Sequence, residues 1–145
     1  MVVGILGLTM ALGFSGCQSE NQKNQDAYRK IGINSMAEGD YDKAVKSFQK
    51  ALDTSLGKIG AEEIDICYYK AAAQFAKKDY DGAIETYTSL IDYDKENANA
   101  YYLRGSVYLD TDKKDKAFKD YKNAVKYAGR EYEICLLYTS DAADE

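Results

Sequence analysis

Two pairs of carboxylates are the clearest candidates for chemistry in this sequence: Asp40 with Asp42, and Asp79 with Asp81. Paired carboxylates of this kind could act as a general acid and a general base. Each pair, however, stands at the start of a stretch with helical spacing. A carboxylate there accepts hydrogen bonds from free backbone N–H groups and meets the positive end of the helix dipole. We therefore interpret the pairs as helix caps and expect no catalytic residue and no enzymatic activity.

A second acidic stretch, from Asp110 to Asp115, resembles a calcium-binding loop in its spacing. Lys114 stands where the loop needs a third ligand, and Tyr121 stands where the bidentate Glu belongs. The sequence contains no histidine, which excludes His-dependent triads, His metal sites and imidazole acid/base chemistry. We expect neither a metal nor a cofactor, and we interpret Cys67 as a core residue at a helix-packing position rather than a redox-active one.

Composition limits the fold and the partners. The 145 residues carry a formal charge of −5, with 46% hydrophobic and 30% charged residues, which is typical of one small globular domain. Binding to nucleic acid is not expected, because a phosphate backbone requires a concentrated basic surface and the lysines are scattered. The absence of proline and the 14 tyrosines favour helices packed by aromatic rings.

An internal repeat organises the middle of the chain. Similar segments recur around Ala44, Ala83 and Ala117, at intervals of 39 and 34 residues. Apolar residues three and four apart give each segment one buried helical stripe, which a single hairpin cannot cover and a stack of hairpins can. We place the five extra residues of the first interval in a loop at 55–60, where an insertion costs little.

The repeat resembles that of the tetratricopeptide-repeat (TPR) family. In each copy a small residue on a first helix and an alanine on a second allow close approach, and an aromatic residue fills the gap to the next copy. The small residues are Gly32, Ala71 and Gly105, and the aromatic residues are Phe48, Tyr87 and Tyr121. Ser35 and Gln74 depart from the family pattern where an aromatic is usual, and Lys70 and Arg104 where leucine is usual. The resemblance implies an all-α TPR solenoid in a domain at 25–134, with repeats at about 25–58, 64–97 and 98–131 and a truncated fourth.

The resemblance also implies a partner-binding groove. In TPR arrays the first helix of each hairpin lines the concave surface. The corresponding residues here are Arg29, Ile33, Met36, Asp65, Tyr68, Phe75, Asn99, Tyr102, Ser106 and Leu109, together with Ala72. The residues with which some family members hold a C-terminal carboxylate are replaced, among others, by Tyr68, Ala72 and Ser106. The groove is therefore expected to bind an extended or helical peptide with apolar anchors, although some of these side chains could instead pack against a neighbouring helix.

The N-terminal segment reads as an export signal. Residues 1–16 are apolar and uncharged, but the run is shorter than the roughly 20 residues that cross a bilayer. The sequence from Phe14 to Cys17 resembles the lipobox of bacterial lipoproteins, in which the cysteine is acylated after cleavage. We expect lipidation at Cys17 and a polar, solvated tether at 17–24. The protein would then be anchored to the cell membrane or the outer membrane and face away from the cytoplasm.

The C-terminal segment 135–145, CLLYTSDAADE, resembles a translated sequencing adapter, so we expect a non-native tail. Residues 131–134 would then begin a fourth hairpin. The sequence as a whole predicts a membrane-tethered scaffold that binds a peptide or protein partner of an envelope, secretion or wall-assembly complex. An open alternative is the N-terminal recruitment domain of a longer enzyme, such as a peptidase or wall hydrolase.

Overall fold

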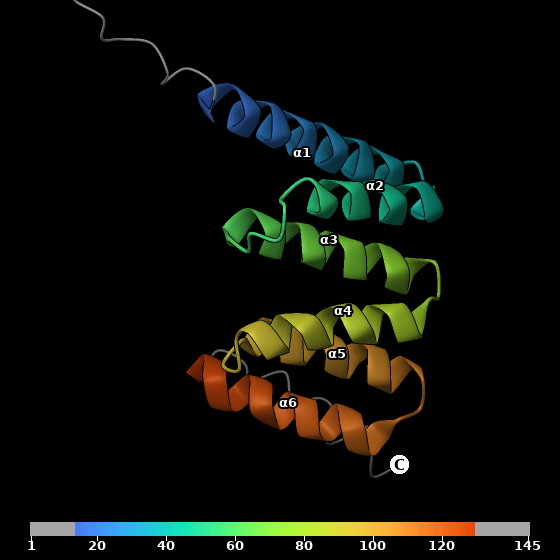
Figure 1. Cartoon of the computed structure of the whole chain (residues 1–145). Helices are drawn as coiled ribbons and strands as arrows, with labels where there is room; N and C mark the ends of the chain where they lie inside the picture. Colours follow the sequence, from blue (N-terminus) through green and yellow to red (C-terminus); the bar gives the residue numbers. More distant parts are fainter. Residues whose placement is uncertain (1–13, 130–145) are drawn as a thin grey trace, which may run out of the picture.

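The computed structural model describes the backbone of residues 14–129 and the side chains of residues 20–129. This part of the chain consists of α-helices and contains no strand: α1 (Phe14–Ala37), α2 (Tyr41–Asp53), α3 (Ala61–Ala76), α4 (Tyr80–Tyr93), α5 (Ala98–Asp110) and α6 (Lys114–Ala128). Each helix packs against the next, and the antiparallel hairpins α1–α2, α3–α4 and α5–α6 are stacked in chain order (Figure 1). The expected all-α array of stacked hairpins is confirmed.

Helix α1 is longer than predicted, because the segment expected to be a separate tether at 17–24 is helical and continuous with it. The segment lacks glycine and proline and contains Gln, Glu and Lys, which lose little freedom in a helix. Its described side chains, from Glu20 to Asn24, are mostly exposed, and Gln25 is only 5% exposed. Packing therefore begins where the repeat domain was predicted to begin, although the helix begins earlier.

The predictions for residues 1–13, for a fourth hairpin at 131–134 and for the tail at 135–145 lie outside the described residues. Among the described helices, none combines the length and the apolar character that crossing a bilayer requires.

The turns within the hairpins share one geometry. Gly39, Lys78 and Asp112 adopt positive φ values of 77°, 66° and 55°. In each turn the following N–H donates to a carbonyl five residues earlier at 2.8 Å, as from Asp40 to Ser35. This is the bond that closes a helix C-terminus in the Schellman motif. The three turns thus repeat in structure even though only one of them has glycine at the strained position.

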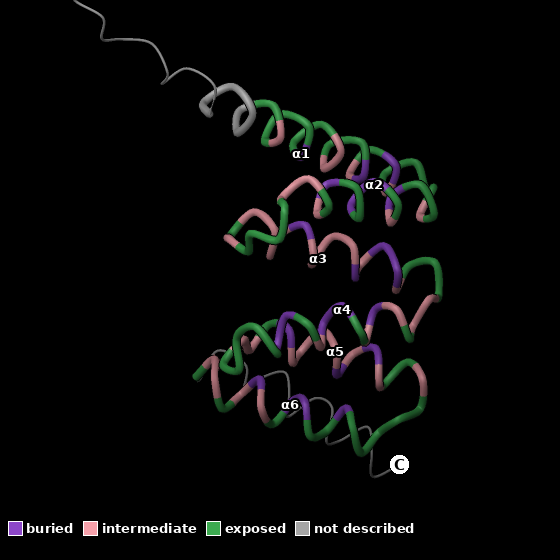
Figure 2. The backbone as a smooth tube through the Cα atoms, in the orientation of Figure 1, coloured by how far each residue is buried: buried purple, intermediate pink, exposed green. Residues whose placement is uncertain are grey.

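The second helix of each hairpin buries one stripe of its surface. In α2 the stripe consists of Ala44, Ser47, Phe48 and Ala51, which recur three and four residues apart. Figure 2 shows the buried residues on the faces that the helices turn toward one another. Phe48 is fully buried and its ring stacks on Tyr69 of the next hairpin, with 5.7 Å between centroids. Burial of such a side chain stabilises the fold by roughly 1.5–3 kcal/mol.

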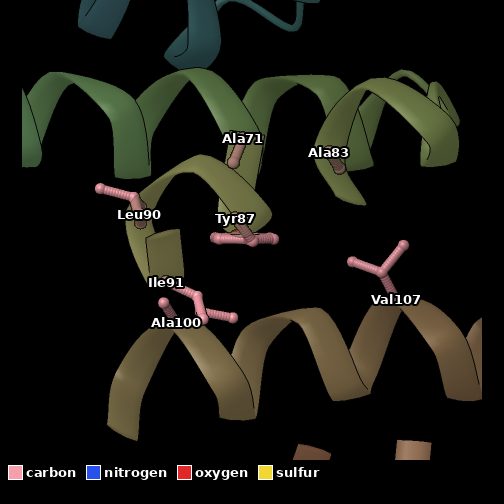
Figure 3. Packing of buried hydrophobic residues seen from close by; sticks show 7 residues of the cluster. All are labelled: Ala71, Ala83, Tyr87, Leu90, Ile91, Ala100 and Val107. Atoms are coloured by element: carbon pink, nitrogen blue, oxygen red, sulfur yellow. The ribbon is translucent and has the colours of Figure 1, made fainter. Parts of the chain in front are cut away.

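The central part of the core joins the second and third hairpins. Its buried members are Ala71 of α3, Ala83, Tyr87, Leu90 and Ile91 of α4, and Ala100 and Val107 of α5 (Figure 3). Tyr87 lies between the small residues Ala71 and Ala83 and the aliphatic residues Ile91 and Val107. Small residues therefore alternate with large ones, which is how the predicted close approach of the helices is achieved.

Candidate functional site

The predicted groove residues lie on α1, α3 and α5, the first helices of the three hairpins. Helix α1 contacts α3 directly, and side-chain bonds join the two helices. Gln25 Nε2 donates to Glu63 Oε1 at 2.7 Å, and Arg29 Nε donates to Asp65 Oδ2 at 3.0 Å. The structure therefore brings the first two sets of predicted residues together on neighbouring helices.

A separate contact connects α3 with the start of α5. The Tyr68 hydroxyl donates to Asn97 Oδ1 at 2.7 Å. The same oxygen accepts from the Ala100 N–H at 3.0 Å, so Asn97 is the N-cap of α5. A groove residue of one hairpin is thus bonded to the residue that starts the groove helix of the next.

The side chains proposed for the groove are all at least partly accessible. Asn99 and Leu109 are exposed, with Leu109 at 44%, and the rest are half-buried: Arg29, Ile33, Met36, Asp65, Tyr68, Ala72, Phe75, Tyr102 and Ser106. None of them is fully buried, so each retains surface that a partner could contact. Ile33 and Met36 also pack against the core cluster that contains Phe48.

Aromatic contacts hold three of these side chains in place. The ring of Tyr68 lies 6.4 Å from that of Tyr87, and the ring of Tyr102 lies 5.6 Å from that of Tyr121. Phe75 meets Tyr80 edge-on, with 5.8 Å between centroids. Such contacts fix ring orientation and reduce the entropy lost when a ligand binds.

Among the predicted groove residues of α1 and α3, the one cation, Arg29, is paired with Asp65. Its hydrogen bond to Asp65 raises the pKa of Arg29, whose guanidinium also lies 5.3 Å from the Tyr69 ring centroid. Burial and then the neighbouring Asp26 raise the pKa of Glu62. This end of the groove is rich in carboxylates, and its arginine is already paired, so the site is poorly suited to an acidic ligand.

The first member of each acid pair is a helix N-cap, as expected, and the second lies in the first helical turn. Asp40 Oδ1 accepts from the Lys43 N–H at 3.0 Å, and Asp79 Oδ1 accepts from the Gly82 N–H at 3.1 Å. Asp42 is paired with Lys77 at 2.9 Å, and that hydrogen bond lowers the pKa of the carboxyl. The pattern does not extend to α6, because Lys113 occupies the equivalent N-cap position and makes no side-chain cap.

The other candidates for chemistry fall outside any assembled centre. No cluster of three or more metal-ligating side chains occurs in the described residues. Cys67 is free and half-buried, and it packs against the central core cluster, as expected of a residue at a helix-packing position. Burial raises the pKa of its thiol. The preceding residue, Ile66, is fully buried.

The sequence did not predict a buried ion pair between α5 and α6. Arg104 donates from Nε and Nη2 to the two oxygens of Asp120 at 2.7 and 2.8 Å, and from Nη1 to Thr88 at 2.9 Å. The side chains are 15% and 5% exposed. The sequence offered one indication of this pair, because Arg104 stands at a position where the repeat usually has leucine. The pair contributes to hairpin packing and not to the groove.

Three family models for this repeat match the chain. Models described as tetratricopeptide repeat match residues 29–87 and 98–130, and one described as TPR repeat matches residues 71–112. Among curated proteins, none matches the sequence significantly.

Several solved structures are similar in fold. The Arabidopsis OM64 TPR domain is 17% identical with a TM-score of 0.67, over 84% of this chain and 98% of that one. The first TPR of Spaghetti (RPAP3), bound to the HSP90 peptide SRMEEVD, is 19% identical with a TM-score of 0.67, over 86% and 96%. MamA is 22% identical with a TM-score of 0.61, over 78% and 63%. At these identities the likeness concerns the fold alone.

Proposed function

Because the chain is an array of tetratricopeptide repeats, we propose that it is a protein-interaction module that holds a peptide or protein segment on α1, α3 and α5. The observation that carries the proposal is the accessibility of aromatic and aliphatic side chains on all three of these helices. Tyrosine and other large apolar residues, held rigidly and partly exposed, are the residue types that dominate binding energy in interfaces.

The chemistry of the groove favours an apolar ligand. One protein of similar fold is bound to the peptide SRMEEVD, which ends in acidic residues and a carboxylate. In this chain Arg29 is engaged by Asp65, and the nearby carboxylates Asp26 and Glu62 would repel such a ligand. We therefore propose that the partner presents apolar anchor residues and does not depend on a terminal carboxylate.

We further propose that a lipid on Cys17 tethers the array to a membrane outside the cytoplasm, where the partner belongs to an envelope, secretion or wall-assembly complex. The support is the lipobox-like sequence that ends at Cys17. The N-terminal part of α1 between Cys17 and Gln25, whose side chains from Glu20 to Asn24 are mostly exposed, would then hold the packed hairpins away from the lipid. At 1.5 Å per helical residue this separation is about 12 Å.

The groove is tested with a peptide selected from a displayed random library against the wild-type protein. Tyr68→Ala and Tyr102→Ala are each expected to weaken that peptide by about 2 kcal/mol, or roughly thirtyfold, measured by isothermal titration calorimetry. Phe118→Ala is the matched control, since it removes an aromatic ring that is 57% exposed on α6 outside the groove. Circular dichroism checks that helicity is retained. Unchanged affinity in both tyrosine variants would refute the assignment of the groove.

The tether is tested independently by Cys17→Ser. The wild-type protein is expected to partition into detergent and to carry the mass of an acylated cysteine, and the variant is expected to do neither. Equal membrane association of the two proteins would contradict lipidation at Cys17 and would leave the groove assignment unaffected.

A further inference from the structure

A second concave site lies between α2, α3 and α4, away from the predicted groove. It is a pocket of about 430 Å³. Its apolar walls are Leu52, Ile59, Ile64, Cys67, Leu90 and Tyr93. None of the predicted groove residues lines it, and its volume falls within the range of ligand sites in proteins, about 300–1,000 Å³.

The pocket owes its rim to the insertion that breaks the repeat. Seven residues connect α2 to α3, whereas four connect α4 to α5, so the loop is three residues longer and not five as predicted. Helix α3 is also longer than α5, with 16 residues against 13, and takes up part of the insertion. Both connections lie on the same side of the stack (Figure 1). In the longer one Leu56 has a φ of 53°, which is rare for a residue with a branched side chain and costs about 1–3 kcal/mol.

The same loop exposes apolar surface. Leu56 is 77% exposed and Ile59 is 57% exposed, and Tyr93 at the end of α4 is 55% exposed. Two of these three side chains, Ile59 and Tyr93, line the pocket, and Leu56 lies in the same loop as Ile59. A strained loop that holds apolar side chains in water loses stability locally, and contact with a partner would recover it.

The pocket is lined by two carboxylates, Asp53 and Glu63, and by one cation, Lys58. Against the effect of burial, the hydrogen bond from Gln25 and backbone N–H groups lower the pKa of Glu63, and Lys58 adds a smaller effect in the same direction. Asp53 accepts a hydrogen bond from the Gln49 amide at 2.8 Å. No cation lies within ion-pair distance of Asp53 in residues 20–129. Its charge is therefore uncompensated at the mouth of the pocket.

Two helix C-termini add negative potential here, while the N-terminus of α3, which begins at Ala61, brings a partial positive charge beside Glu63, and Lys50 stands in the last turn of α2. Helices α2 and α4 both end at the pocket, at Asp53 and Tyr93, and each helix C-terminus carries a partial negative charge. The last turn of α4 contains no basic residue, and the next residue is Asp94. The site thus combines apolar walls with a rim that would attract positive charge.

We propose that this pocket is a second protein-binding site, which takes a large apolar side chain of a partner polypeptide whose neighbouring Lys or Arg meets Asp53. The pocket has room for a leucine or phenylalanine side chain. The partner's cation would pair with the Asp53 carboxylate and interact with the negative C-terminus of α4. An anionic membrane surface is disfavoured by the same charges. This site is independent of the groove, so a partner could occupy both.

The test uses Cys67 as a reporter inside the pocket. The full chain with Cys17→Ser and Cys135→Ser retains Cys67 as its single cysteine. Alkylation by N-ethylmaleimide is followed by mass spectrometry in the presence of the capped hexapeptide Gly-Ser-Phe-Lys-Ser-Gly, or of the same peptide with Glu in place of Lys. At about ten times its Kd, the lysine peptide is expected to slow alkylation about tenfold, because only the free protein reacts. The glutamate peptide is expected to give no protection at the same concentration.

Two pocket variants and one groove variant make the result specific. Asp53→Asn is expected to weaken the lysine peptide about two- to fivefold, the effect of one exposed ion pair. Ser89→Trp fills the pocket from the exposed face of α4 and should abolish protection with the circular dichroism spectrum unchanged. The groove variant Leu109→Ala should leave protection intact.

Equal protection by the two peptides would overturn the charge preference, and no protection by either would overturn the site. A thiol that is protected without peptide and becomes reactive on dilution would mean that a second copy of the chain occupies the pocket, which also overturns the proposal. None of these outcomes bears on Tyr68 or Tyr102, so the groove stands or fails separately.

Discussion

Replacing Gly32 by alanine tests how tightly the first hairpin is packed. An ideal Cβ at Gly32 would lie 2.5 Å from Phe48 Cε1 and 2.7 Å from both Cδ1 and Cζ. Carbon atoms in contact are normally about 3.5–4.0 Å apart, so the ring would have to move by about 1 Å. Phe48 is fully buried and stacks on Tyr69, which leaves the ring no free direction.

The expected change in stability is the difference between two effects. Overpacking a closed core costs about 1–3 kcal/mol, and a clash of this depth belongs near the upper end. Alanine is better than glycine in a helix by about 1 kcal/mol, which opposes that loss. We expect Gly32→Ala to lower the free energy of unfolding by about 2 kcal/mol.

The assay is urea unfolding followed by circular dichroism, with hydrogen exchange to show that the loss is concentrated in α1 and α2. Asn34→Ala on the exposed face of α1 is the control, since it changes helix propensity without entering the core. The equivalent position in the second hairpin is Ala71, in the cluster with Tyr87. Ala71→Gly is also expected to destabilise, by about 1 kcal/mol.

The double variant Gly32→Ala with Phe48→Leu should lose less free energy of unfolding than the sum of the two single variants, because leucine leaves room for the added methyl group. A Gly32→Ala protein that is more stable than the wild type would refute the reasoning, since helix propensity would then outweigh the contact with Phe48.

Two further changes probe the third hairpin and the central core. Asp120→Ala should lower the free energy of unfolding by about 3 kcal/mol, because it removes the ion-pair partner of the largely buried Arg104. The double variant Arg104→Met with Asp120→Leu should recover most of that stability. Equal losses in the single and double variants would contradict the prediction. Burial, with a smaller contribution from Tyr68, raises the pKa of Tyr87 from 10 to about 12. The unfolded chain therefore loses this proton first, so the stability associated with Tyr87 is present below pH 10 and is lost as the pH rises through 12. Ultraviolet difference titration should show a late tyrosine step that Tyr87→Phe removes, and a titration identical to that of the wild type would argue against it.

The repeated parts of the molecule could be predicted because the same physical requirement appears in the sequence three times. A small residue opposite an aromatic ring, as at Gly32 with Phe48 and at Gly105 with Tyr121, predicted the close approach of the helices in each hairpin. Asp40 was predicted as a cap for the same reason, since the cap position lies four residues before the marker alanine.

The features that could not be predicted depend on contacts between residues that occur once. Arg104 and Asp120 are 16 residues apart, and their pairing follows from how α5 and α6 are docked. Cys67 packs against the core as expected, but the pocket that it also lines could not be predicted, because that pocket is formed by residues of α2, α3, α4 and the loop together. The continuity of α1 was missed because a polar composition was interpreted as a tether, although the same residues are good helix formers.

The departures from the repeat are therefore where the individual character of this protein is to be sought. A residue that follows the 34-residue pattern is explained by packing, as Phe48 and Tyr87 are, and gives no information on a partner. Leu56 follows no such pattern: it is 77% exposed at a positive φ, in the loop between α2 and α3. The same loop contributes Ile59 to a pocket whose carboxylate Asp53 has no ion-pair partner in residues 20–129. Packing within the array gives no reason for these costs, so the loop, more than the groove, should distinguish the partners of this chain from those of other repeat arrays.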